Sequence, residues 1–194
     1  MKFFTILSNI CLFGRQIIIF GFIILICGIT HAQGIATRTI TLQEMADRIA
    51  IKELIDAYAH DADRRDSEAQ SNLFMPDGII ENYEGEPTAT NKPDAILKGR
   101  KELRNGFATL KKYDITMHFN GQSDLQLNGD TATGETYCLA HQFWNENKQR
   151  ILMIIGIRYY DTFVRANGSW FFAKRKLIFD WIDRKPSKTR NPGE

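Results

Sequence analysis

Hydrophobic and polar positions follow two different patterns along this chain, and the change between them divides it into a helical part and a strand-rich part. Between Thr41 and Asp66, apolar residues recur three and four positions apart, which is the spacing of one face of an α-helix. The members of this apolar stripe are Ile51, Leu54, Ile55, Tyr58 and Ala62. From Ile115 onward the chain is rich in aromatic and β-branched residues, which favours strands.

Turn-forming residues limit the elements between these two parts. We expect a short second helix over 67–74, stopped by the Met-Pro-Asp-Gly segment at 75–78, and then a strand over 79–84. Residues 85–95 are rich in turn formers and predict an exposed loop. A third helix is predicted over 99–113.

The second half predicts a meander of strands. Their expected ranges are 115–127, 131–145, 149–165 and 169–183. Asn128-Gly129 and Asn167-Gly168 lie at two of the joins, and Asn-Gly between strands is the strongest short signal of a hairpin. Helices followed by such strands indicate an α+β domain, in which a curved antiparallel sheet wraps around the N-terminal helices.

The first 32 residues have the pattern of a signal peptide. Residues 17–29 carry no polar side chain, and the only charges in this segment are the positive ones of Lys2 and Arg15. This apolar run is shorter than the roughly 20 residues of a membrane-spanning helix. Small residues at the −3 and −1 positions predict cleavage after Ala32. We expect an exported protein, periplasmic or secreted, that meets a membrane only through the signal peptide before cleavage; an uncleaved anchor is the alternative.

Removal of the predicted signal peptide changes the charge and the cysteine content. The full chain has 25 basic and 23 acidic residues, and Lys2 and Arg15 account for the excess, so the mature part is neutral. Because nucleic-acid binding rests on clustered positive charge, we expect no nucleic-acid partner. Only Cys138 of the three cysteines remains, which predicts no internal disulfide. The mature chain then divides into an extension at 33–40, one domain at 41–184 and a disordered tail at 185–194.

Two histidines of the predicted sheet are candidates for chemistry. If Asn128-Gly129 is a two-residue turn, His118 and His141 are diagonal neighbours on one face of the hairpin, about 7–8 Å apart. If Gly129-Asp130 is the turn, the two histidines lie directly opposite each other. The same face then also carries Asn120, Tyr137, Leu139 and Phe143. This mixture of polar and apolar residues predicts a half-apolar cavity, with an exposed or interface face as the alternative.

A histidine that acts as a base needs a partner that orients its ring and stabilises its cation, and a carboxylate does both. The carboxylates available are at the end of the first helix. Asp63 follows Ala62 at the edge of the apolar stripe, where it can reach inward, although a surface charge is the alternative. Asp61 and Asp66 have the pattern of solvated or capping residues.

Several short segments resemble the SnoaL-like branch of the NTF2-like superfamily. They are Tyr58-x4-Asp63-Arg64-Arg65-Asp66, Thr116-Met117-His118-Phe119, His141-Gln142, and Gly168-Ser169-Trp170 with Arg175. Within this superfamily they are most similar to scytalone dehydratase, bile-acid 7α-dehydratase and the lindane dehydrochlorinase. The resemblance covers about residues 41–184. It implies a cone-shaped, cystatin-like α+β barrel with a buried pocket for a small-molecule substrate, and a homo-oligomer, trimer or dimer, formed through the outer sheet face.

The resemblance also implies roles for particular residues. Asp63 matches the orienting aspartate and His118 the general base. His141 matches a second pocket histidine, and Tyr58 a pocket tyrosine. Tyr83 is placed near a tyrosine that polarises a carbonyl. Arg175 falls near an arginine used for the leaving group, with Lys174 as the alternative.

The predicted activity is a cofactor-independent, dehydratase-type elimination on a small apolar substrate that contains a carbonyl group. An isomerase or hydratase with the same Asp–His pair, and a module that binds a ligand without chemistry, are the alternatives. Neither a Gly-x-Ser-x-Gly elbow, a phosphate loop nor a His-Glu-x-x-His motif occurs. Cys138 and His141 are three apart on a strand, hence on opposite faces, and cannot pair as nucleophile and base. No metal site is expected, because the resembling enzymes use the histidines and the aspartate without one.

Overall fold

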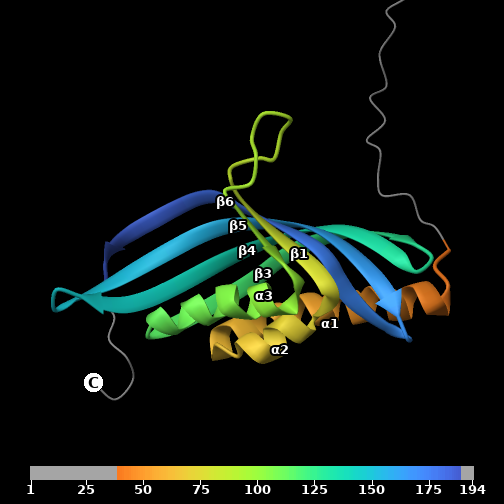
Figure 1. Cartoon of the computed structure of the whole chain (residues 1–194), viewed down its shortest axis with the longest axis horizontal. Helices are drawn as coiled ribbons and strands as arrows, with labels where there is room; N and C mark the ends of the chain where they lie inside the picture. The colour runs from red at the N-terminus through yellow and green to blue at the C-terminus, as the bar shows by residue number, and fades with distance from the viewer. Residues whose placement is uncertain (1–38, 189–194) are drawn as a thin grey trace, which may run out of the picture. The chain divides into compact units, whose positions relative to one another are not determined.

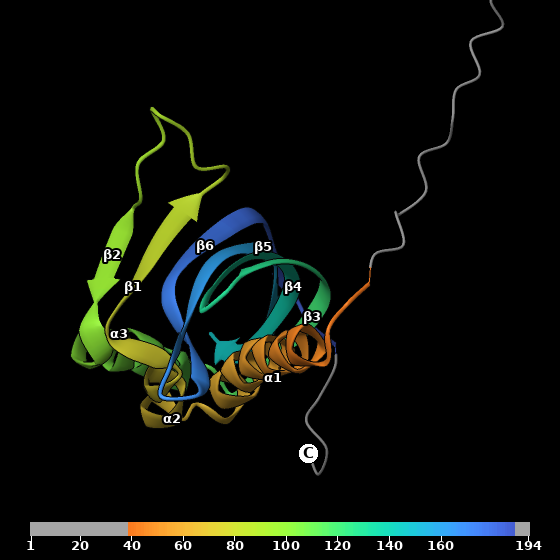
Figure 2. The same ribbon diagram turned by 90° about the vertical axis from the view of Figure 1, so that its right-hand side faces the viewer.

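The computed structural model describes residues 39–188, in which three α-helices lie on one side of a curved, six-stranded sheet (Figures 1 and 2). The predicted signal peptide at 1–32 and most of the extension at 33–40 lie outside the described residues, so both stay predictions. Within residues 39–188, no helix combines the length and the apolar composition needed to cross a membrane.

Helix α1 (Leu42–Arg64) has a defined cap at each end. The hydroxyl oxygen of Thr41 accepts a hydrogen bond from the Glu44 N–H at 3.0 Å, which satisfies one of the free donors of the first turn. The helix ends where Arg65 adopts a φ of 57° and its N–H bonds back to the last turn. All five residues of the predicted apolar stripe are buried, which confirms that prediction.

The six strands form one sheet in the order β2-β1-β6-β5-β4-β3. Their bounds are β1 (Phe74–Glu84), β2 (Ala95–Lys98), β3 (Ile115–Asn128), β4 (Thr131–Glu146), β5 (Gln149–Ala166) and β6 (Ser169–Pro186). All neighbours are antiparallel except β1 and β6, which run parallel. The sheet curves around the helices but does not close, because β2 and β3 remain free edges (Figure 2).

The second helix is shorter than the sequence indicated. Helix α2 (Ser67–Asn72) ends early, and β1 begins at Phe74. The Phe172 N–H donates to the Leu73 carbonyl at 3.0 Å, and the rings of Phe74 and Phe172 stack with centroids 5.0 Å apart. Pairing with β6 thus overrides the local turn signal, and a register shift within β1 accommodates the proline and glycine there.

The remaining connections follow the predictions with two differences. Helix α3 (Gly99–Phe107) continues as a 3₁₀ segment (Ala108–Lys112), close to the expected third helix. Ala95, the last residue of the predicted loop, is the first residue of β2. The rest of the loop projects from the convex side of the sheet (Figure 1). The predicted tail was placed too early, because Lys185 and Pro186 still pair with β5.

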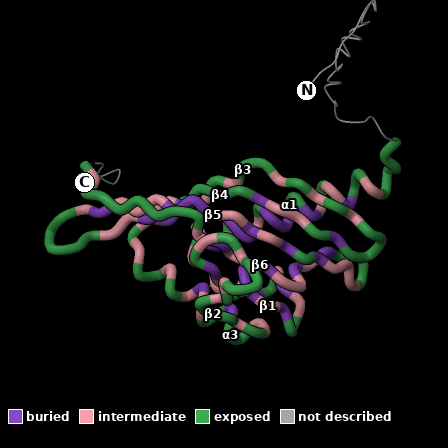
Figure 3. Tube along the Cα trace, turned by 90° about the horizontal axis from the view of Figure 1, so that it is seen from above, coloured by how far each residue is buried: buried purple, intermediate pink, exposed green. Residues whose placement is uncertain are grey.

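The core lies between the concave face of the sheet and the helices. Buried residues follow the middle of the strands, whereas the hairpin ends are exposed (Figure 3). Aromatic side chains dominate this core: Tyr58 makes edge-to-face contacts with Phe74, Phe107, Tyr159 and Phe172, with centroids 5.7–6.1 Å apart. The helices and the central strands are therefore fixed to one another by a rigid aromatic cluster.

Candidate functional site

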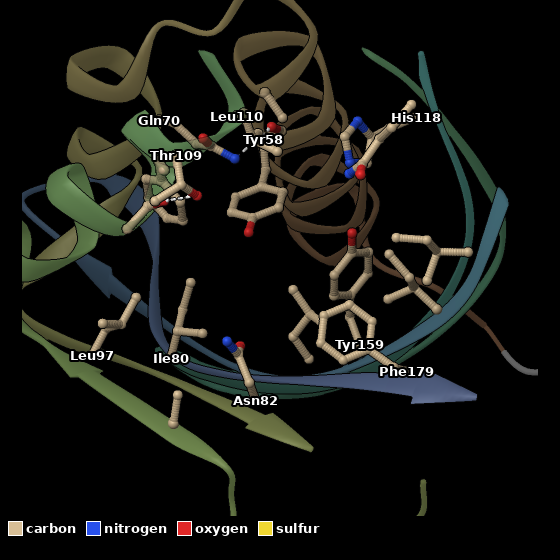
Figure 4. Close-up of a pocket in the computed structure, with 18 residues that line it drawn as sticks. Tyr58, Gln70, Ile80, Asn82, Leu97, Thr109, Leu110, His118, Tyr159 and Phe179 are labelled. Atoms are coloured by element: carbon tan, nitrogen blue, oxygen red, sulfur yellow. Dashed lines mark hydrogen bonds between the residues drawn. The ribbon is translucent and has the colours of Figure 1, made fainter. Parts of the chain in front are cut away.

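A cavity of about 370 Å³ opens between the helices and the concave face of the sheet (Figure 4). This volume suits a small organic molecule. Its wall is mostly apolar. The apolar contributors are Ala62, Ile80, Ala95, Leu97, Gly106, Phe107, Leu110, Ile155, Ile157, Leu177 and Phe179. The polar side chains of the wall are Tyr58, Gln70, Asn82, Thr109, His118, Gln142 and Tyr159.

Strand β3 is fixed along the C-terminal half of α1 by its inward-facing residues. The Thr116 hydroxyl donates to the Ala62 carbonyl at 3.3 Å. Two positions on, the His118 N–H donates to Asp63 Oδ2 at 2.9 Å. Two positions further, the Asn120 amide donates to the Ile55 carbonyl at 3.3 Å. These contacts set the imidazole of His118 beside the end of the helix.

Asp63 and His118 form a close pair at the cavity wall. Asp63 Oδ1 lies 2.7 Å from His118 Nδ1, and the side chains are 27% and 8% exposed, respectively. A carboxylate at Nδ1 favours the tautomer with the proton on that nitrogen, which leaves a lone pair on Nε2. No hydrogen bond occupies Nε2 within the described part of the chain, and the ring borders the cavity (Figure 4). The arrangement has the geometry of an oriented base.

Two buried tyrosines share the cavity with this histidine. Tyr58 on α1 and Tyr159 on β5 both line the wall, and their rings are in edge-to-face contact with centroids 5.9 Å apart (Figure 4). Burial raises the pKa of the Tyr58 hydroxyl, and the positive charge of Arg175 offsets part of that rise. Burial likewise raises the pKa of Tyr159 well above its usual value. Both phenols therefore stay protonated near neutral pH and can donate hydrogen bonds.

Arg175 does not line the cavity. It is fully buried beneath the tyrosines, with its guanidinium carbon 4.1 Å from the ring centroid of Tyr58 and 4.0 Å from that of Tyr159. Its Nε and Nη2 donate to the two carboxylate oxygens of Asp161, both at 2.8 Å. The expectation that Arg175 contacts the substrate is therefore wrong, because a buried ion pair and aromatic rings enclose it. Its alternative, Lys174, pairs with Glu81 outside the cavity wall.

The prediction that His118 and His141 share a face of the sheet is wrong. The turn is Gly129-Asp130, because Asn128 pairs with Thr131, and this register alone would place the histidines opposite each other. A register shift between Asn120 and Ser123 moves the strands by one residue, so His118 pairs with Ala140. His141 consequently pairs with Met117 and points to the convex face.

Three further expected binding residues face away from the cavity. Tyr137 and Phe143 alternate with the inward-facing Gln142 and so lie on the convex face with His141. Tyr83 alternates with Asn82 on β1, and its hydroxyl donates to Glu81. Burial, followed by the hydrogen bond with Glu81, raises the pKa of Tyr83.

Asn120 faces inward but does not border the cavity. Its amide donates to α1, at the Ile55 carbonyl and at Asp56 Oδ1, 3.2 Å away. It therefore holds β3 against the helix. Cys138 on β4 pairs with Asn120 and is buried on the same face of the sheet. Burial raises the pKa of its thiol to about 11, so the thiol stays protonated. Among residues 39–188, no group of three or more His, Cys, Asp or Glu side chains is placed to hold a metal ion.

Five polar residues of the wall were not recognised from the sequence: Gln70, Asn82, Thr109, Gln142 and Tyr159. Tyr159 had a signal, because Ile155, Ile157 and Tyr159 alternate along β5 and share its inner face. Gln142 was missed because the predicted register assigned the inward-facing position to its neighbour His141. Asn82 is two positions after Ile80 in a short predicted strand, so the two residues share a face of that strand. The pattern does not show that this face lies near His118 and Tyr58.

Comparison with known proteins gives a family match and distant relatives. Residues 43–176 match the SnoaL-like domain. The uncharacterized protein Rv2910c of Mycobacterium tuberculosis is 24% identical over 136 residues, which are 70% of this chain and 87% of that protein.

Solved structures of similar fold include two proteins of particular interest. A scytalone dehydratase-like protein from Novosphingobium aromaticivorans is 20% identical, covers 79% of this chain and 97% of its own, and superposes with a TM-score of 0.65. A hexachlorocyclohexane dehydrochlorinase, LinA type 2, is 21% identical and superposes with a TM-score of 0.62. The match covers 79% of this chain and 99% of that protein. At these identities the likeness establishes the fold. Because the family model spans most of the chain, this protein belongs to the SnoaL-like domain family of the NTF2-like superfamily.

Proposed function

We propose that this protein is a cofactor-independent lyase, in which His118 removes a proton from a carbon next to a carbonyl group. The single observation that carries the proposal is the free Nε2 of an imidazole whose Nδ1 is held by Asp63, in a mostly apolar cavity. The apolar wall favours a largely apolar substrate, and the fold is shared with the dehydratase-like protein and the dehydrochlorinase described above.

The proposed reaction is a β-elimination of water. His118 Nε2 takes the proton from the α-carbon, and the electrons of that bond pass to the carbonyl oxygen as an enolate. A hydrogen bond from Tyr58 or Tyr159 stabilises the developing charge on this oxygen. The enolate then re-forms the carbonyl as the bond from the β-carbon to its hydroxyl breaks. This gives a carbon–carbon double bond, and the proton that His118 took passes to the departing hydroxide, which forms water and restores the neutral imidazole. Asp63 stabilises the imidazolium while His118 carries the proton.

Proton abstraction can be tested without the natural substrate. The protein is incubated in D₂O with 1-indanone, and loss of the α-hydrogen signal is followed by NMR. With 3-hydroxy-1-indanone, formation of the conjugated enone reports loss of water. The proposal expects both rates to exceed those of buffer and to fall to background in His118→Gln. The matched control is His60→Gln, because His60 is an exposed residue of α1 outside the cavity wall.

The two alternatives give different results in the same experiment. Exchange that depends on His118, without loss of water from the hydroxyketone, favours an isomerase that uses the same pair. Binding of the ketones with no exchange above buffer favours a module that binds a ligand without chemistry. Exchange equal in the wild type and in His118→Gln contradicts the assignment of His118 as the base.

The proposal also includes self-association through the convex face of the sheet. Large apolar side chains are exposed there on β3, β4 and β6. The most exposed are Met117, Phe119, Tyr137, Leu139 and Trp181. Phe119 is 69% exposed, which is unusual for a phenylalanine at the surface of a monomer. Light scattering of the wild type and of Phe119→Lys tests this part, and a wild-type monomer contradicts it.

A further inference from the structure

Two amide side chains in the cavity wall lack hydrogen-bond partners in the protein. Asn82 Oδ1 and Gln142 Oε1 are both buried and unpaired within the described part of the chain. Gln142 is only 6% exposed, and both residues border the cavity. A buried amide without a partner is unfavourable, so such groups in native proteins call for an explanation.

Two other neutral polar side chains of the wall, Gln70 and Thr109, donate to the protein itself. The Gln70 amide donates to the Tyr58 carbonyl at 3.3 Å, and the Thr109 hydroxyl donates to the Gly106 carbonyl at 2.7 Å. Gln70 and Thr109 therefore each donate a hydrogen bond within the protein. Among the wall residues that the structure describes, Asn82 and Gln142 are the amides whose oxygens are buried without a partner, and Figure 4 shows the Asn82 amide directed into the cavity.

These amides sit on well-separated strands. Asn82 belongs to β1 and Gln142 to β4, with β6 and β5 between them in the sheet. Three steps of strand spacing amount to about 14 Å along the curved sheet. Gln142 lies next to the base, because it pairs with Thr116 and the neighbouring Ala140 pairs with His118. The Gln142 amide is therefore close to His118, and the Asn82 amide lies on the opposite side of the cavity.

Among the described residues that form the wall, none carries a fixed charge. No Lys, Arg, Asp or Glu side chain is among the residues that line it, and the phenols of Tyr58 and Tyr159 stay neutral. A carboxylate or phosphate on the ligand would enter without a counter-charge, which is costly in an apolar site. An amide can donate to a carbonyl or accept from a hydroxyl, so uncharged oxygen groups suit both positions.

We propose that Asn82 and Gln142 determine specificity by binding two oxygen groups, hydroxyl or carbonyl, at opposite ends of an uncharged substrate with an apolar body. This inference rests on the proposed function and narrows its substrate class. It disfavours halogenated hydrocarbons, because a molecule without hydrogen-bonding groups would leave both amides unpaired.

The test is equilibrium dialysis of the full protein with a size-matched panel: naphthalene, 2-naphthol, 2-naphthoate, and 1,3-, 1,6- and 2,7-dihydroxynaphthalene. We expect the best diol to bind about tenfold or more tightly than naphthalene, because it gains two hydrogen bonds. The near-isosteric changes Asn82→Leu and Gln142→Met should each reduce this preference about threefold or more, while naphthalene binding is kept or improved. Retained naphthalene binding also shows that each variant is folded.

Matched controls make the same changes outside the cavity. Asn145→Leu and Gln126→Met alter exposed residues of β4 and β3 and should leave the preference intact. Equal affinity of the wild type for naphthalene and all diols, tighter binding of 2-naphthoate than of every diol, or a preference unchanged in both cavity variants overturns the inference. If these results coincide with elimination that depends on His118, the proposed function still stands. A diol preference without exchange or elimination overturns the proposed function, and leaves the amides as determinants of binding alone.

Discussion

Asp63 holds His118 at two points, with Oδ1 at the ring Nδ1 and Oδ2 at the backbone N–H of the same residue. The carboxylate therefore fixes both the strand position and the ring orientation. Because its helix ends at Arg64, directly after Asp63, the side chain can reach the neighbouring strand without a long flexible connection. This contact joins the two parts of the chain that the sequence pattern distinguishes.

Asp63→Asn should lower turnover in the elimination assay by about 10²- to 10⁴-fold. The asparagine keeps the shape but loses the charge that stabilises the imidazolium and selects the tautomer of His118. The measurement is kcat for 3-hydroxy-1-indanone, with circular dichroism as the check on folding. Asp61→Asn is the matched control, since Asp61 is on the same helix turn and outside the cavity wall. Unchanged kcat in Asp63→Asn would show that the pair does not act in the reaction.

The two sheet histidines should respond differently to the same substitution. His118→Gln removes the free Nε2 and is expected to abolish exchange of the ketone. His141→Gln changes a residue on the opposite face of the sheet and should retain at least about half of the activity, because it leaves the cavity wall intact. Comparable losses in both variants would contradict the assignment made from the strand register.

The strand register explains how far the sequence could predict this site. The helix stripe and the approximate ranges of the four C-terminal strands follow from local periodicity, whereas for Asp63 the pattern left an inward position and a surface charge both open. Which residues of β3 and β4 lie on the same face of the sheet depends on one bulge. There Gly121 and Gln122 together oppose Tyr137. An isolated glycine inside a strand pattern is a signal of such a bulge, but it does not fix the number of residues shifted.

Long-range pairing accounts for the other differences. The early start of β1 depends on Phe172, a residue almost a hundred positions away, and no local pattern contains that information. The same holds for Arg175. Its position near the leaving-group arginine of the resembling enzymes suggested a ligand contact. Its ion-pair partner, Asp161, lies on the neighbouring strand β5 within a run of aromatic residues, and no local pattern indicates this pairing.

Loss of either tyrosine hydroxyl should affect catalysis more than stability. Tyr58→Phe and Tyr159→Phe keep the ring packing of the aromatic cluster, so the midpoint of thermal unfolding should change little. The variant whose hydroxyl contacts the enolate oxygen is expected to lose about 10- to 1,000-fold in kcat, as for removal of one hydrogen-bond donor to a developing charge. Parallel measurements of kcat and KM for both variants identify which tyrosine acts. Full activity in both would exclude a phenol as the donor.

Arg175→Met should destabilise the fold by about 3–5 kcal/mol, because it leaves the Asp161 carboxylate buried without its partner. Urea unfolding monitored by tryptophan fluorescence gives the free energy of unfolding. The double variant Arg175→Met with Asp161→Leu is the informative companion. It should recover much of the loss, since replacing both partners by apolar side chains removes the unpaired charge. A double variant no more stable than Arg175→Met would contradict this view of the pair.

Asp47 should make the stability of the fold depend on acid pH. Its Oδ1 accepts hydrogen bonds from Trp170 Nε1 at 3.0 Å and from Arg165 Nη1 at 2.7 Å, which tie α1 to β5 and β6. Burial alone would raise the pKa of this carboxyl, but the hydrogen bonds from Trp170 and Gln43 and the charge of Arg165 outweigh it and lower the pKa. A lowered pKa means that the folded state favours the ionised form.

The stabilisation from Asp47 is therefore fully present above the pKa of the unfolded chain, about 3.9, and is lost as the pH falls through the lower value of the folded state. Asp47→Asn should cost about 1–3 kcal/mol at pH 7, and the difference from wild type should shrink between pH 5 and pH 3. Urea unfolding at pH 7, 5, 4 and 3 measures this. Asp130→Asn is the control, because Asp130 bonds the same Arg165 but is exposed, and it should change the free energy of unfolding by less than about 1 kcal/mol at pH 7. A difference between wild type and Asp47→Asn that is equally large at pH 7 and pH 3 would show that the charge of Asp47 is not what stabilises the contact.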